Sequence, residues 1–152
     1  FKMSIILSIF ILSYTNFKFK DLNGKEIELD SLLEKGPVIL DFWATWCTYC
    51  DEVLDILKEI KEEYKDKIEI IALSWDTQKT ASKIEPLLKS RGWNFIIGID
   101  EGKKIGRIYG VLFLPTTFVI TKEKGIVYKK VGYNPKEKEE IKKIIEENLK
   151  KE

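Results

Sequence analysis

The sequence predicts an α/β protein with a central mixed sheet flanked by helices, and three observations lead to this expectation. Nearly continuous apolar runs at residues 38–43 and 68–74 are typical of strands that are buried on both faces. Segments with helical periodicity alternate with the strands, which is the pattern of βαβ units in a mostly parallel sheet. A short turn at residues 122–125 then joins the last two strands, so the sheet should finish with an antiparallel hairpin and a packed terminal helix.

Composition supports one globular domain and excludes several function classes. The chain has 152 residues, of which 44% are apolar and 34% charged, enough for a single core and too apolar for a disordered chain. The net charge of +1 leaves no overall field that would gather nucleic acid or anionic lipid. There is no histidine, and the only two cysteines cannot build a four-cysteine site within one chain. We therefore expect no metal and no cofactor.

The first fifteen residues are set apart from the rest of the chain. Residues 4–13 are mostly apolar but shorter than the about 20 residues that a transmembrane helix needs. Their length fits the apolar centre of a secretory signal, with Lys2 before it and residues 13–15 as a cleavage context. A buried first strand or helix is the alternative. We expect a signal or anchor remnant over residues 1–15, which would tether the chain to a membrane or export it, and one domain over residues 16–152.

The domain should begin with a hairpin. Residues 17–20 and 25–29 alternate between apolar and polar around Asn23-Gly24, the strongest short hairpin signal. Residues 30–33 predict a short helical turn before the first buried strand.

Four further helices are expected. A long helix follows residue 50, and its apolar side chains recur at helical spacing: Val53, Leu54, Leu57, Ile60 and Tyr64. A second helix covers residues 79–90, where Pro86 should kink it or mark its true start. A third is short and covers residues 103–109. The last begins at residues 134–135, where asparagine provides a good cap and proline takes the first helical position.

The remaining strands lie in the second half of the chain. One is expected at residues 95–99, another at residues 113–120 with a break at Pro115, and the last from Gly125. No internal repeat and no second domain is visible in the sequence.

The chemistry lies in Cys47 and Cys50, which follow a buried strand and open the long helix. A helix amino terminus presents free N–H groups and a partial positive charge, and both should lower the pKa of the Cys47 thiol. The thiolate attacks a disulfide, and Cys50, one turn along, can then resolve the mixed disulfide. Two inert buried cysteines, or half of a zinc site shared between chains, are the alternatives. The placement after a strand, beside Trp46 and without other ligands, favours the redox interpretation.

Two motifs resemble the thioredoxin family. Residues 41–50 are similar to its active-site strand and helix, and residues 114–120 to its cis-proline strand. Residues 17–29 and the extra helix and strand over residues 77–99 resemble the TlpA/ResA branch of extracytoplasmic, often membrane-anchored reductases involved in cytochrome c maturation. The resemblance covers roughly residues 16 to 150. It implies a thioredoxin fold with an N-terminal β-hairpin and a helix–strand insertion.

The resemblance also implies roles for individual residues. Asp41 matches the buried acid beneath the redox pair, whose pKa burial would raise so that it accepts the proton of Cys50; a hydrogen-bonded strand-end aspartate is the alternative. Pro115 matches the proline whose cis bond faces the disulfide, with Leu114 contacting the substrate, although an ordinary trans proline at a strand edge is the alternative. Trp46 matches the aromatic that shields the pair, or it is a core tryptophan.

The sequence departs from the family around the second cysteine. Thr48 and Tyr49, the residues between the cysteines, include neither the common proline nor the histidine of strongly oxidising members, which argues for a reductant. We expect both to contact substrate, with Tyr49 shaping access and partner choice. Asp51 and its neighbour Glu52 could oppose a low thiol pKa, although an acidic first turn is favourable for any helix. The branch also carries an acid near its active site, for which Asp76 is the candidate.

Three functions remain open at this point. The first is a protein-disulfide reductase that needs protein disulfide or dithiol substrates and an upstream thiol donor, and that works outside the cytoplasm as a monomer. The second is a non-catalytic binding module that holds a partner in the groove at Pro115. The third is a peroxidase of the related peroxiredoxin class, whose single cysteine flanked by proline and threonine has no match here. The intact pair, with Asp41 beneath it, favours the first.

Overall fold

The computed structural model describes residues 13–149. Its helices and strands, in chain order, are β1 (Lys18–Lys20), β2 (Glu26–Glu28), α2 (Leu29–Leu33), β3 (Val38–Trp43), α3 (Thr48–Tyr64), β4 (Glu69–Ser74), α4 (Ile84–Arg91), β5 (Ile96–Ile99), α5 (Lys104–Ile108), β6 (Thr116–Thr121), β7 (Gly125–Val131) and α6 (Glu137–Leu149). The expected signal or anchor segment falls almost entirely outside the described residues. Within residues 13–149, no helix has both the length and the apolar character needed to cross a bilayer.

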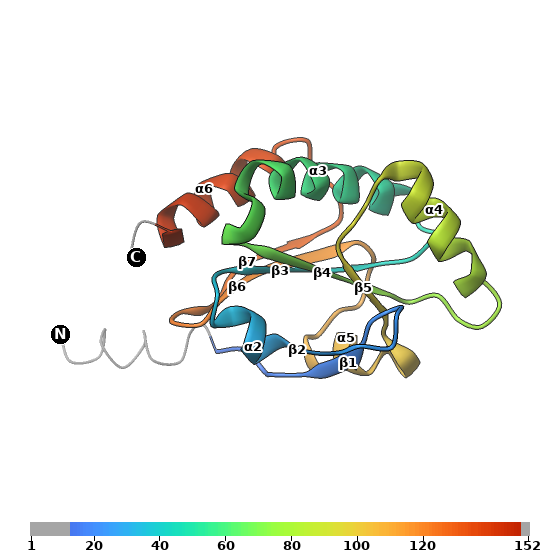
Figure 1. The fold of residues 1–152 in the computed structure, drawn as a ribbon. Coiled ribbons are helices and arrows are strands. Elements are labelled where there is room, and N and C mark those ends of the chain that lie inside the picture. Colours follow the sequence, from blue (N-terminus) through green and yellow to red (C-terminus); the bar gives the residue numbers. More distant parts are fainter. Residues whose placement is uncertain (1–12, 150–152) are drawn as a thin grey trace.

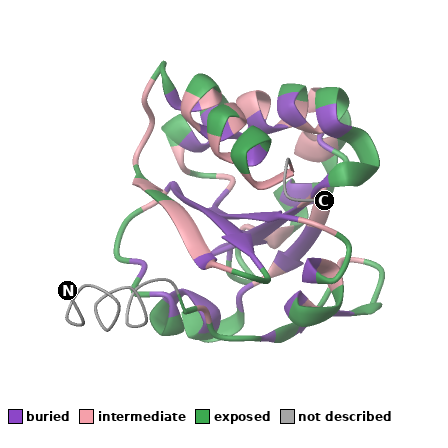
Figure 2. Cartoon of the chain, turned by 90° about the vertical axis from the view of Figure 1, so that its left-hand side faces the viewer, coloured by how far each residue is buried: buried purple, intermediate pink, exposed green. Residues whose placement is uncertain are grey.

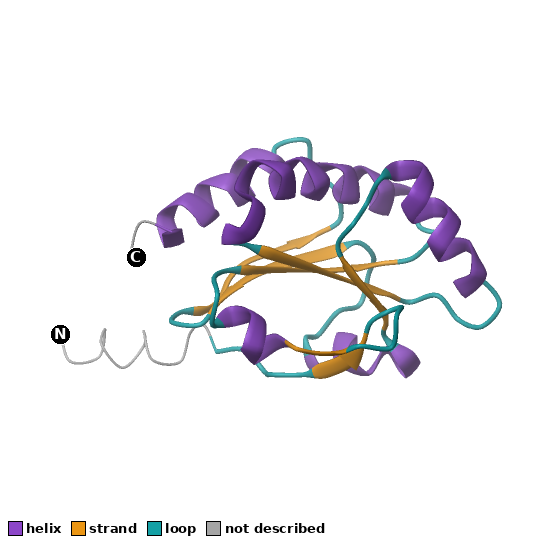
Figure 3. Cartoon of the chain, in the orientation of Figure 1, coloured by secondary structure: helices purple, strands orange, loops and turns teal. Residues whose placement is uncertain are grey.

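A five-stranded mixed sheet forms the centre of the molecule, in the order β5-β4-β3-β6-β7 (Figure 3). Strand β3 runs parallel to β4, and β4 runs parallel to β5, whereas β6 is antiparallel to both β3 and β7. All six residues of β3 are buried, as its apolar run predicts for a central strand covered on both faces. The predicted sheet, with parallel strands first and an antiparallel hairpin last, is confirmed.

Helices cover the sheet on both sides. Helices α3, α4 and α6 lie over one face, and α2, α5 and the β1–β2 hairpin lie over the other (Figure 1). Seen from the side, the sheet is a buried layer between two partly exposed ones (Figure 2). Because side chains alternate along a strand, Ile39 and Trp43 of β3 pack with α3 and α6, and Leu40 and Phe42 pack on the opposite face. Asp41, between Ile39 and Trp43 in this alternation, therefore faces the α3 and α6 layer.

The N-terminal hairpin confirms the turn expected at Asn23-Gly24. Asp21 Oδ1 accepts hydrogen bonds from the backbone N–H groups of Asn23 and Lys25, both at 2.9 Å. Gly24 adopts a φ of +83°, which favours glycine. The hairpin packs on the sheet at Gly98, where a Cβ atom would come within 2.5 Å of the Phe19 ring. A glycine at this position of β5 therefore lets the hairpin approach.

Two expected elements start later than their sequence patterns indicate. The strand expected at residues 113–120 begins at Thr116, because Pro115 has no N–H to donate to the sheet, so only its second part is confirmed. The helix expected at residues 79–90 begins at Ile84 after a single 3-10 turn. Pro86 lies in its first turn, where no intrahelical N–H bond is lost, so the proline marks the start and not a kink. Gly92 ends this helix with a φ of +71°.

The terminal helix packs against the sheet as expected. Asn134 Oδ1 accepts a hydrogen bond from the backbone N–H of Lys136 at 2.7 Å, which caps the start of α6. Ile141 and Ile145, one turn apart, are fully buried against the sheet and α3.

Candidate active site

Cys47 and Cys50 form a disulfide at the start of α3, with their Cα atoms 5.4 Å apart. Cys47 is the N-cap residue with an extended backbone, and Cys50 lies in the first helical turn. Cys47 is half-buried, whereas Cys50 is completely buried. Only the first sulfur is therefore open to a partner, and it sits where the free N–H groups of the helix favour an anion.

The loop before Cys47 is held in place by Asp76. This buried carboxylate accepts hydrogen bonds from the backbone N–H and the hydroxyl of Thr45, and from the hydroxyl of Ser74. Burial raises the pKa of Asp76, but the hydrogen bonds from Ser74 and Thr45 outweigh it, so the pKa falls below its ordinary value. We infer that Asp76 stays ionised and fixes the loop, a structural role for the acid that the resemblance brought forward.

Asp41 lies fully buried in β3, on the face that α3 covers. Its Oδ1 atom accepts a hydrogen bond of 2.7 Å from the Thr117 hydroxyl, which belongs to the neighbouring strand β6. Burial raises the pKa of Asp41 well above its ordinary value, and this exceeds the opposite effect of the Thr117 hydrogen bond. A carboxylate whose pKa is raised in this way is a stronger proton acceptor than an exposed one.

Pro115 lies at the same end of the sheet as the redox pair. The Leu114–Pro115 peptide bond is cis, as the resemblance predicts. Thr116 pairs with Phe42 near the end of β3 from which the loop to Cys47 leaves. Leu114 and Cys47 both pack against the hydrophobic clusters that cover the two faces of the sheet.

Exposed aromatic side chains surround this end of the molecule. Trp46 is 58% exposed, Tyr49 62% and Phe113 66%. The alternative of a core tryptophan at position 46 is therefore wrong, whereas Trp43, Trp75 and Trp93 are buried. The Tyr49 ring stacks on Tyr133 with centroids 6.2 Å apart, which gives it a defined position.

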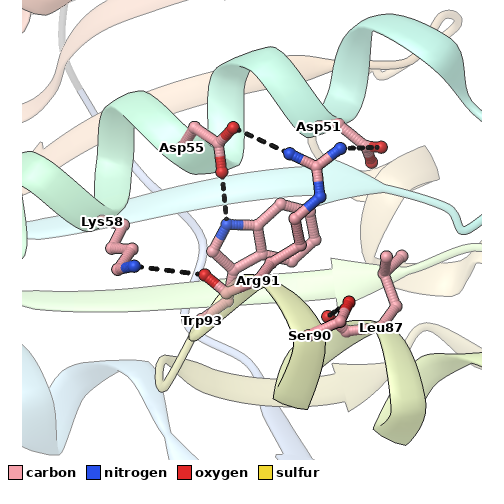
Figure 4. A network of polar contacts seen from close by, with 7 residues as sticks. All are labelled: Asp51, Asp55, Lys58, Leu87, Ser90, Arg91 and Trp93. Carbon is pink, nitrogen blue, oxygen red and sulfur yellow. Dashed lines mark hydrogen bonds and ion pairs between the residues drawn. The ribbon is translucent and has the colours of Figure 1, made fainter.

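The acidic first turn of α3 is paired with a cation from α4. Arg91 contacts Asp51 at 3.0 Å and Asp55 at 2.9 Å, and Trp93 donates its indole N–H to Asp55 at 2.9 Å (Figure 4). From the sequence, Asp51 could either oppose a low thiol pKa or simply form a favourable acidic first turn. The guanidinium offsets the charge of Asp51, which favours the Cys47 thiolate.

Two residues of the site region carry no local signal in the sequence. Thr117 is one of several threonines in an apolar strand, and its role follows from its pairing with Asp41 across β3 and β6. Glu137 follows Asn134 at the spacing of a capping box, which indicates an exposed helix start, yet it is completely buried. Only the packing of α6 on the sheet brings it inside.

The comparisons with known proteins agree with this geometry. The model of the AhpC/TSA family matches residues 13–129. The thiol-disulfide oxidoreductase ResA of Bacillus thuringiensis (strain Al Hakam) is 42% identical over 132 residues, which cover 85% of this chain and 75% of that protein.

Solved structures share the fold. StoA from Bacillus subtilis has a TM-score of 0.69 at 21% identity, covering 85% of this chain and 95% of that one. The pneumococcal exposed lipoprotein thioredoxin Etrx1 from Streptococcus pneumoniae strain TIGR4 has a TM-score of 0.70 at 25% identity, covering 88% and 99%. The chain therefore belongs to the AhpC/TSA family, as a thioredoxin-fold thiol–disulfide oxidoreductase related to ResA.

Proposed function

We propose that the chain reduces disulfides of partner proteins, with Cys47 as the nucleophile and Cys50 as the resolving thiol. The observation that carries this proposal is the unequal exposure of the two sulfurs at a helix start: Cys47 is half-buried and Cys50 fully buried. An exposed cysteine at that position has the lowered pKa that a nucleophile needs, and a buried one is protected from outside thiols.

The proposed reaction runs in two exchanges. The Cys47 thiolate attacks one sulfur of the partner's disulfide, forms a mixed disulfide and releases the partner's other sulfur as a thiolate. Asp41 then accepts the proton of the Cys50 thiol, and the new Cys50 thiolate attacks the Cys47 sulfur. The partner leaves fully reduced, and the Cys47–Cys50 disulfide remains. A thiol donor must then return two electrons and two protons to the pair.

The reducing direction rests on the residues between the cysteines. Thr48 and Tyr49 offer no cation that would stabilise the Cys47 thiolate further. In strongly oxidising members of the fold it is the stabilised reduced form that drives oxidation of substrates. A measured potential below that of the glutathione couple supports this direction, and a potential well above it refutes it.

We further propose that partners dock on the aromatic surface at this end, formed by Trp46, Tyr49 and Phe113, and that Leu114 and Pro115 contact the segment next to the disulfide. Exposed aromatic side chains are enriched in protein interfaces. The expected substrate is therefore a protein disulfide flanked by apolar residues, recognised by a monomer of this chain.

Localisation outside the cytoplasm is part of the same proposal. It is supported by the apolar run at residues 4–13 and by the related Etrx1, which is described as an exposed lipoprotein. In intact cells, a thiol reagent that does not cross membranes should label the reduced protein. Labelling only after lysis would contradict this localisation.

Insulin reduction by dithiothreitol tests the activity. The wild-type protein should accelerate the turbidity that follows insulin reduction, and Cys47→Ser should not. Cys50→Ser is the matched control, because it keeps the nucleophile and should accumulate a mixed disulfide. Equal rates for all three proteins would refute the enzymatic proposal and favour a binding module. Turnover of hydrogen peroxide in place of insulin would favour the peroxidase alternative.

A further inference from the structure

The first turn of α6 contains a buried acid that the proposed reaction does not use. Glu137 is fully buried, and within the described residues neither of its carboxylate oxygens has a hydrogen bond of good geometry. Burying a carboxyl group without such partners costs free energy that a helix start exposed to water would not. The position therefore calls for an explanation beyond the start of the helix.

Sheet register brings Glu137 next to the proposed proton acceptor. Asp41 of β3 lies opposite Thr117 of β6, and Thr117 lies opposite Lys130 of the edge strand β7. Cross-strand neighbours point to the same face of a sheet, and α6 covers this face. The polar side chains of Asp41, Thr117 and Lys130 therefore lie next to one another on this face, from the interior of the sheet to its edge. The Thr117 hydroxyl donates to Asp41 at 2.7 Å and also lies beside the Glu137 carboxyl, whose charged form it stabilises.

The two carboxyl groups influence each other's protonation. Burial raises the pKa of Glu137 to about 7, and the backbone of Asn134, the Thr117 hydroxyl and Lys130 offset this only in part. The pKa of Asp41 is raised by burial first and by the charge of Glu137 as well. Two buried acids in this relation do not ionise independently, and the protonation of one favours the ionised form of the other.

We propose that Glu137 is a second buried acid of the redox site. Asp41 takes a proton from Cys50, and the Thr117 hydroxyl passes this proton on to Glu137. The inference rests on the proposed role of Asp41 as acceptor. Glu137 does not contact the sulfurs and acts only through the protonation of Asp41, so it is a positioning residue and not a catalytic residue.

The proton balance of this step is simple. Once Cys50 has passed its proton to the Asp41 carboxylate, protonated Asp41 donates to Thr117 Oγ1. The hydroxyl gives its own proton to the Glu137 carboxylate. Asp41 is again a carboxylate and Thr117 again a hydroxyl, while the proton of Cys50 resides on Glu137. No electrons move in this step, and the proton leaves to water where Lys130 is half-buried at the sheet edge.

Other charged groups around Glu137 are accounted for. Glu140 raises the pKa of Glu137 and itself accepts a hydrogen bond of 2.8 Å from the Tyr128 hydroxyl of β7. On the side of α3, two glutamates pair with lysines of α6 at 2.7 and 3.1 Å: Glu59 with Lys138, and Glu63 with Lys142. The sequence has no histidine, so no imidazole titrates in the same pH range.

The competing explanation is that Glu137 merely completes the cap of α6. The backbone N–H of Asn134 stabilises the Glu137 carboxylate as in a capping box, and glutamate and glutamine are both favoured three residues after a cap. Glu137→Gln therefore keeps what a cap needs and removes only the titratable proton. Glu139→Gln is the matched control, because it removes the same charge from an exposed position of the same turn.

Carbon-13 NMR of side-chain carboxyls across a pH series tests the inference on the full chain. The Asp41 pKa should fall by about one pH unit in Glu137→Gln, because a neighbouring negative charge is lost, and should stay at the wild-type value in Glu139→Gln. In Thr117→Val it should rise, because a hydrogen bond to the carboxylate is lost. An Asp41 titration in Glu137→Gln that matches wild type, or shifts no more than in Glu139→Gln, overturns the inference.

A kinetic arm separates this inference from the function on which it rests. The pH profile for resolution of the mixed disulfide should move to lower pH in Glu137→Gln by the same amount as the Asp41 pKa. An unmoved profile refutes the relay. If Asp41→Asn resolves the mixed disulfide at the wild-type rate at every pH, the role of Asp41 itself fails, whatever the NMR titration gives.

Discussion

Replacing Glu137 with glutamine should remove a loss of folding stability that the oxidised wild-type protein suffers as the pH rises. In the unfolded chain the carboxyl ionises near its ordinary pKa of 4.5, whereas in the folded protein burial raises this pKa to about 7. Below pH 4.5 the group is protonated in both states and contributes nothing. As pH rises from 4.5 to 7 the unfolded chain releases a proton that the folded protein keeps, so the wild type loses stability through this window.

The size of this loss follows from the same two values. One pKa unit corresponds to about 1.4 kcal/mol, so the shift from 4.5 to about 7 means that ionised Glu137 destabilises the fold by about 3 kcal/mol at pH 8. The glutamine variant lacks this loss. Any cost of burying the glutamine amide is independent of pH. The informative quantity is therefore how the difference in unfolding free energy between variant and wild type changes with pH. The pKa of Asp41 is raised too, in part by the charge of Glu137, so its lower pKa in the variant adds to the difference in the same direction.

Urea denaturation of both proteins in the oxidised state, at pH 4.5 and at pH 8, measures this quantity. The difference in unfolding free energy between variant and wild type should grow by about 3 kcal/mol in favour of the variant between the two pH values. A difference that stays constant would mean that Glu137 is not an ionising group in a buried setting, and the reasoning about its proton would be refuted.

Three further predictions concern the redox pair, its electrostatics and the core. Cys50→Ser should trap partner proteins as mixed disulfides that appear on non-reducing gels and vanish with reductant, whereas equal trapping by Cys47→Ser would contradict the assigned order. Arg91→Met should raise the pKa of the Cys47 thiol, because the charge of Asp51 is no longer offset, and the alkylation rate as a function of pH measures this pKa. The increase should shrink at 1 M salt. Lys89→Met, which changes an exposed residue of the same helix, should leave the pKa of the Cys47 thiol unchanged. Phe118→Ala should lower the unfolding free energy by about 3–5 kcal/mol, because it empties a buried site between the rings of Phe42 and Tyr109; a loss below 1 kcal/mol would mean that the core collapses around the gap.

The sheet and its redox motif could be predicted because their signals are local. An unbroken apolar run such as residues 38–43 indicates a strand covered on both faces, and β3 is the central strand. The turn at Asn23-Gly24 and the cap at Asn134 act within a few residues of the chain, and both are found where the sequence places them. The position of Cys47 at a helix start follows from the strand before it and the periodicity after it.

Features that depend on contacts between distant segments could not be predicted in this way. Arg91 meets Asp51 across 40 positions of sequence, and Tyr49 meets Tyr133 across 84. The capping pattern at Asn134 indicates an exposed Glu137, but the docking of α6 on the sheet buries it. The position of Trp46 stayed open between an aromatic that shields the redox pair and a core residue, because the burial of a tryptophan depends on packing by distant segments.

Alkylation of the reduced protein tests the central claim most directly. A brief exposure to iodoacetamide at pH 7, followed by denaturation and mass spectrometry of the peptides, reports which sulfur is the accessible thiolate. The account predicts one alkyl group for each chain, carried by Cys47, with Cys50 labelled only after unfolding. Alkylation of Cys50 first, or of both sulfurs at equal rates, would contradict the roles assigned to the two cysteines.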